Sequence, residues 1–144
     1  MVQRKRNKSN LNKNMTLVEI LGILLIHWFA DFVLQTDKQA KGKSKNWADL
    51  LAHTGVYTGV FWIIGLLVVI FRHKGGDSVE YLHVFLFSVI TFIAHTITDY
   101  FTSRLNSKLW ADGKVHNFFV SVGFDQWLHY VQLFTTYYFL KNGI

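Results

Sequence analysis

The sequence contains no cysteine and no proline. Without cysteine the chain cannot form disulfides or thiolate metal sites, so histidine, aspartate and glutamate are the strong metal ligands that remain. Without proline no helix carries a proline kink, which favours straight helices. Charged residues are also scarce, at 17% of the chain against about a quarter in soluble domains. This shortage of charge favours a membrane protein.

Hydrophobic residues make up 51% of the sequence and are gathered in long runs. Residues 50–71 and 81–98 contain no aspartate, glutamate, lysine or arginine. A helix needs about 20 apolar residues to cross the hydrocarbon core of a bilayer, and each of these runs is close to that length. The sequence therefore predicts at least two transmembrane helices.

Two further apolar stretches complete a predicted set of four helices, at about residues 15–35, 47–71, 80–101 and 118–140. Glycines at positions 42, 75, 76 and 113 fall between them. Short connections make successive helices antiparallel neighbours. We therefore expect an all-α fold, a four-helix transmembrane up-down bundle that forms a single domain over residues 15–144.

Residues 1–14 form a basic N-terminal arm, which we expect to be flexible, and the formal net charge of the chain is +6. Basic residues beside a first transmembrane helix usually set topology or contact anionic head groups. We therefore expect membrane lipids, and not nucleic acid, as the partner of the arm. Glu19 and Trp28 argue against a cleaved signal peptide, so the first helix is expected to be retained. The basic residues divide almost evenly between the two sides, with a small excess that places both termini in the cytoplasm.

Each predicted helix carries polar side chains at intervals of four residues. They are His27, Asp31 and Gln35; Asp49, His53 and Tyr57; His95 and Asp99; and Asp125 and His129. Residues four apart lie on one face of an α-helix, so each set forms a stripe. In an antiparallel bundle the four stripes fall toward one membrane face, with the histidines of the first three helices roughly 10 Å below the helix ends. We expect the stripes to meet in a pocket that opens to one side.

Ionisable side chains that face lipid cost several kcal/mol each, so they normally face the bundle interior. Imidazole and carboxylate groups are ligands of zinc, manganese and iron, and a divalent cation would offset the desolvation of the carboxylates. Zinc is the favoured metal, with one or two ions. The predicted ligands are His27, Asp31, His53, His95, Asp99, Asp125 and His129. Gln35 and Tyr57 are predicted to orient ligands or a substrate.

Three functions remain open from the residues alone. The first is a metal-dependent hydrolase, in which Asp31 or Asp125 serves as the general base. The lysines at positions 38, 41, 43 and 45 would attract an anionic substrate, a phosphorylated or lipid-linked molecule, or else contact anionic lipids. The second is a proton- or cation-coupled transporter or channel. The third is a membrane partner protein whose polar core is structural.

Several other residues favour one of these functions, and others have no predicted chemical role. Apolar residues beyond the stripes are expected to close a conduction path, which favours a one-sided site; they are Ile23, Leu24, Ile63, Leu67 and Phe87. Asp49 is predicted to interact with the start of its helix. The remaining histidines, His73, His83 and His116, are expected to be solvated, and Glu19 is given no role.

The segments "HWFADFVLQTDKQA", "HTGVY", "HTITDY" and "DQWLH" resemble a family of small bacterial and phage integral membrane proteins. That family carries the motifs H-x-x-A-D-F-x-x-Q, H-x-x-x-Y, H-x-x-x-D and D-Q-x-x-H, and the resemblance spans about residues 20–132. It implies a location in a bacterial inner membrane and adds Gln126 to the predicted orienting residues. The chain is also loosely similar in architecture to membrane-bound metal-dependent hydrolases. The family implies no activity, and the oligomeric state is open.

Overall fold

A computed structural model describes residues 14–72 and 76–143, and the statements that follow concern those residues. In chain order the elements are α1 (Leu17–Trp28), a π-helix η1 (Phe29–Val33), α2 (Asp37–Gly42), α3 (Trp47–Arg72), α4 (Ser78–Ala111) and α5 (Val115–Asn142). No strand occurs in this part of the chain, so the predicted all-α class is confirmed. Apart from Asn14, the predicted basic arm lies outside the described residues, as does His73.

The first predicted helix is shorter than expected and changes its winding. Thr16 and Glu19 form a capping box that starts α1. After Trp28 the backbone widens into the π-helix η1, which brings the successive residues Ala30 and Asp31 both into the interior. The prediction of one straight helix over residues 15–35 is therefore wrong, because the π-turn ends the regular winding near Phe29. Such single π-turns occur often at functional sites.

Two other boundaries differ from the predictions. Residues 37–42, expected as a loop, form α2, which begins at a second capping box made by Thr36 and Gln39. The third predicted helix, which is α4, continues past its predicted end at residue 101 to Ala111. It ends where Gly113 takes a φ of 68°, and the amide of Lys114 donates to the carbonyl of Leu109. These are the features of a Schellman motif, which a glycine accommodates without strain.

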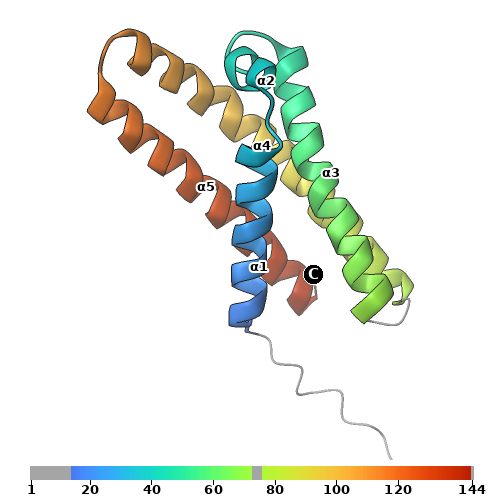
Figure 1. The fold of residues 1–144 in the computed structure, drawn as a ribbon. Helices are drawn as coiled ribbons and strands as arrows, with labels where there is room; N and C mark the ends of the chain where they lie inside the picture. The colour runs from blue at the N-terminus through green and yellow to red at the C-terminus, as the bar shows by residue number, and fades with distance from the viewer. Residues whose placement is uncertain (1–13, 73–75, 144) are drawn as a thin grey trace, which may run out of the picture.

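The long helices pack side by side, with α4 against both α3 and α5, while α1 contacts α3 and α5. In Figure 1, α2 and the turn between α4 and α5 lie at the upper end of the molecule, and the start of α1 and the end of α5 lie at the lower end. His53 lies six residues after the start of α3, near the predicted depth. His95 lies deeper than predicted, about 24 Å from the end of α4, because that helix is longer.

The interior is unusually polar, and the outer surface is apolar. A small core of buried Ile23, Ala30, Tyr57, Phe61 and Leu133 lies at the centre of the helices. Beside it are buried polar side chains that include four histidines and four aspartates. Large hydrophobic side chains are exposed on every long helix, for example Leu25, Ile63, Ile93 and Phe124. This distribution is the reverse of that in a soluble protein.

Candidate metal centre

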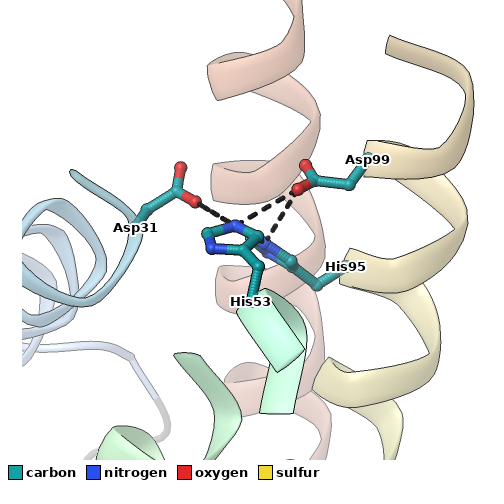
Figure 2. A group of neighbouring side chains, drawn as sticks. All are labelled: Asp31, His53, His95 and Asp99. Atoms are coloured by element: carbon teal, nitrogen blue, oxygen red, sulfur yellow. Dashed lines mark hydrogen bonds and ion pairs between the residues drawn. The ribbon is translucent and has the colours of Figure 1, made fainter. Parts of the chain in front are cut away.

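Four side chains from three elements converge at the centre of the protein. Asp31 comes from η1, His53 from α3, and His95 and Asp99 from α4; Figure 2 shows them pointing toward one another. All four are buried. One ligand atom from each lies within 4.8 Å of the corresponding atoms of the other three, so the group could hold a metal ion. We call this set the primary group.

The spacing within the primary group resembles that of ligands around one ion. His53 Nε2 lies 3.0 Å from Asp31 Oδ1 and 3.2 Å from Asp99 Oδ2. His95 Nε2 lies 3.6 Å from each of the same two oxygens, and the two Nε2 atoms are 3.3 Å apart. A tetrahedral zinc ion with bonds of about 2.0–2.1 Å would set its ligand atoms about 3.3 Å apart. The observed separations lie on both sides of that value.

A second group shares Asp99 with the first. It consists of Asp99, Asp125 and His129, whose ligand atoms also lie within 4.8 Å of one another. His129 Nε2 lies 3.2 Å from Asp99 Oδ1 and 3.5 Å from Asp125 Oδ1. Asp99 therefore presents Oδ2 to the primary group and Oδ1 to the second. We call this second set the secondary group.

A chain of hydrogen bonds holds the carboxylates from outside. Gln126 Nε2 donates to Asp31 Oδ2 at 3.2 Å and to Asp125 Oδ2 at 3.1 Å. Because ionised carboxylates only accept hydrogen bonds, the amide nitrogen must face them and Oε1 must face His27. His27 Nε2 then donates to Gln126 Oε1 at 2.8 Å, and Tyr57 Oη donates to His27 Nδ1 at 2.7 Å.

This chain of hydrogen bonds gives His27 a role different from the predicted one. Both ring nitrogens of His27 are engaged, by Tyr57 and Gln126, and neither belongs to the primary or the secondary group. The other six predicted ligands all belong to those groups. His27 was predicted as a ligand because it shares a stripe with Asp31, but the π-turn and the glutamine on α5 place it behind the carboxylates. Tyr57 contacts His27, and Gln126 contacts His27, Asp31 and Asp125.

Lys43 reaches the primary group from the end of α2. Its Nζ donates to Asp99 Oδ2 at 2.9 Å and lies 3.5 Å from His53 Nε2. Burial alone would lower the pKa of this ammonium, but the carboxylates of Asp99 and Asp31 outweigh that effect and raise the pKa above its ordinary value. The other three lysines of this segment, Lys38, Lys41 and Lys45, are exposed; Lys38 pairs with Asp49 and Lys41 with Asp37, both at 3.7 Å.

Comparison with known proteins assigns the chain to a family. The family model described as "Protein of unknown function (DUF3307)" matches residues 20–143. The chain belongs to this family. No curated protein and no solved structure matches it. The DUF3307 match includes every residue of the primary and secondary groups, together with Lys43 and Gln126.

Other polar residues of the DUF3307 chain lie apart from the centre. Gln35 lies beyond the end of η1, and its buried Nε2 makes no hydrogen bond. Asp49 lies near the start of α3, where its amide donates to Asn46 Oδ1 and its carboxylate accepts from Asn46 Nδ2, in agreement with the helix-start role. His116 is exposed, as predicted, whereas His83 is half-buried.

Glu19 has structural partners that the sequence did not indicate. Besides capping α1, it pairs with Lys141 at 2.8 Å and accepts a hydrogen bond from Tyr137 Oη at 2.6 Å. These contacts join the start of α1 to the end of α5, at the end of the molecule opposite α2 (Figure 1).

Proposed function

We propose that this DUF3307 protein spans a bacterial inner membrane with four helices, formed by α1 with η1, α3, α4 and α5. Residues 47–71 of α3 and the whole of α4 are long and apolar enough to cross a bilayer. In their most apolar windows 22% and 17% of residues are buried, whereas the core helix of a soluble protein would be mostly buried. Apolar outer faces around a polar interior are the arrangement that a lipid environment favours.

The same proposal assigns a divalent metal ion to the primary group. The observation that carries it is the set of 3.0–3.6 Å separations among two imidazole nitrogens and two carboxylate oxygens. Two buried carboxylates so close together repel each other unless positive charge lies between them. Lys43 supplies one positive charge, but a single ammonium does not contact all four ligand atoms. Mixed nitrogen and oxygen donors in near-tetrahedral spacing favour zinc, with manganese and iron as alternatives.

The activity that fits this centre best is hydrolysis of a phosphorylated or lipid-linked substrate. A divalent ion lowers the pKa of a bound water and polarises a phosphoryl or acyl oxygen. Of the two carboxylates predicted as general base, Asp31 is inside the primary group, so Asp125 is the one that remains available to accept a proton. Lys43, fixed beside Asp99, is placed to neutralise an anionic substrate.

The test is metal-dependent hydrolysis by the purified full-length chain in lipid nanodiscs. We expect release of nitrophenol from p-nitrophenyl phosphate, loss of that activity with a chelator, and recovery with zinc or manganese. His53→Gln should abolish both metal binding and hydrolysis. His116→Gln, a change of the same kind at an exposed position, should affect neither. If the chain holds a stoichiometric metal but hydrolyses neither this phosphate ester nor p-nitrophenyl acetate, the hydrolase assignment is wrong.

Cation transport is a second candidate function, and one observation favours it. A cavity of about 390 Å³ lies on the opposite side of the hydrophobic core from the primary group. Its lining includes Glu19, Glu80 and His83. Between that cavity and His95, α4 buries the polar residues Ser88 and Thr91. Of the apolar residues predicted to close such a path, Ile63 and Leu67 are exposed on the outer face, whereas Ile23 is buried in the core and Phe87 packs against it.

Zinc or proton flux into liposomes that contain the chain separates the two candidates. Transport predicts flux without a hydrolysable substrate, whereas hydrolysis predicts activity in detergent, where no membrane separates two compartments.

A further inference from the structure

We propose that the metal centre is binuclear, with a second divalent ion bound by Asp99, Asp125 and His129 and with Asp99 as the bridging carboxylate. This inference rests on the proposed metal-dependent function and specifies the form of its centre. Its first support is the division of Asp99, whose Oδ2 faces His53 and His95 while its Oδ1 faces His129. Two-metal sites hold their ions about 3.5–4 Å apart, a spacing that one carboxylate can bridge.

The second support comes from the carboxylate oxygens that Gln126 does not contact. Its amide group takes the Oδ2 atoms of Asp31 and Asp125. The other oxygens, Asp31 Oδ1 and Asp125 Oδ1, are buried, accept no hydrogen bond of good geometry, and face His53 Nε2 at 3.0 Å and His129 Nε2 at 3.5 Å, respectively. Asp125 is only 8% exposed. One glutamine therefore turns one carboxylate oxygen toward the imidazole nitrogens of each group, and a cation at each position would bind that oxygen together with those nitrogens.

The secondary group also has suitable spacing for an ion. Asp99 Oδ1 and Asp125 Oδ1 lie 3.2 Å and 3.5 Å from His129 Nε2, close to the separation of about 3.3 Å expected around a tetrahedral ion. His129 stacks on His95, with ring centroids 4.2 Å apart, and this contact fixes the ring of each group against the other. The two groups are thus in direct contact.

The two positions differ in what they can do. Four protein atoms complete a tetrahedral shell in the primary group, whereas three protein atoms in the secondary group leave one position for water or substrate. The hydrolytic water therefore belongs at the secondary position, and in this binuclear form Asp125 is a ligand of the second ion and not the general base that it would be beside a single ion. Two divalent ions and Lys43 carry more positive charge than the three carboxylates carry negative charge, so the centre attracts an anion. A phosphate monoester dianion has the charge and the oxygen atoms to span both ions.

Metal counting and electron paramagnetic resonance test the inference in the full-length chain. The protein in detergent is stripped with a chelator, loaded with Mn²⁺ and desalted, and its manganese is counted by elemental analysis. We expect roughly two ions per chain and the spectrum of a spin-coupled pair, as in other two-metal sites. Asp125→Asn and His129→Gln should each retain about one ion with an uncoupled spectrum, because the primary group stays intact. The controls Asp112→Asn and His116→Gln change exposed residues and should keep the coupled spectrum.

The outcomes separate this inference from the proposed function. About one uncoupled ion per chain in the unsubstituted protein, unchanged in Asp125→Asn, would overturn the second position and leave a mononuclear centre. Absence of stoichiometric metal would overturn the proposed function itself. The count and spectrum of the unsubstituted protein decide the matter even if a variant fails to fold.

Discussion

Replacement of Gln126 by leucine tests whether the hydrogen-bond chain behind the carboxylates prepares them for a metal. The substitution keeps a side chain of similar size but removes the donors to Asp31 and Asp125, which are 3.2 and 3.1 Å away. Hydrogen bonds to charged groups contribute about 1.5–3 kcal/mol each to stability. Most of that contribution to stability is present both with and without the metal ion. Only the part that comes from orienting the two carboxylates changes the affinity for the ion.

Residues that orient metal ligands from outside typically contribute 10- to 100-fold to affinity, or roughly 1.4–2.7 kcal/mol, and we expect Gln126→Leu to lower zinc affinity by that factor. Competition with a chromophoric chelator in detergent measures the dissociation constant. Gln132→Leu on the same helix is the matched control, because it also removes two donor contacts, to Thr91 and Thr136, away from the centre. Equal affinity in Gln126→Leu and the unsubstituted chain, or equal weakening in both variants, would refute the reasoning.

Three further predictions concern α2 and the membrane topology. Lys43→Met should raise zinc affinity about tenfold, because the ammonium 2.9 Å from Asp99 no longer competes with the ion. The same substitution should raise KM for an anionic substrate. Lys45→Met is the exposed control, and weaker zinc binding by Lys43→Met would contradict this role. Gly42→Ala should destabilise the fold by about 1–3 kcal/mol in denaturant titration, because the added Cβ would overlap the Asp49 side chain. Gly59→Ala is the control, since a Cβ at that position meets nothing within 4 Å. Equal stability of the two variants would argue against this packing. Because the chain lacks cysteine, single cysteines at Ser44 and Asp112 can be labelled selectively in intact cells with a membrane-impermeant thiol reagent. Both should be labelled from the same side, and labelling from opposite sides would exclude the four-helix topology.

The sequence was sufficient to predict most of the side chains that come together, because ionisable residues in long apolar helices normally face the interior. Intervals of four placed His53, His95, Asp99 and His129 on interior faces, and the structure brings them together. The all-α class followed from the apolar runs in the same way. Periodicity of this kind survives errors in helix ends, so the misplaced end of α4 did not change which side chains meet.

What could not be predicted depends on the path of the chain between helices. No residue pattern marks the π-turn at Phe29–Val33, which separates the role of His27 from that of Asp31. The Thr36 to Gln39 capping box was present in the sequence and could have revealed α2. Which of four lysines reaches Asp99 depends on where α2 ends, and spacing alone does not determine that. Lys43 therefore emerged only from the structure.

X-ray absorption at the zinc edge of the purified chain tests the central claim most directly. We expect stoichiometric zinc with a first shell of nitrogen and oxygen at about 2.0–2.1 Å, imidazole scattering, and no sulfur. His95→Gln combined with Asp99→Asn should remove that signal. Protein that is folded but binds no zinc, manganese or iron, even after reconstitution, would contradict the assignment of these four side chains as metal ligands.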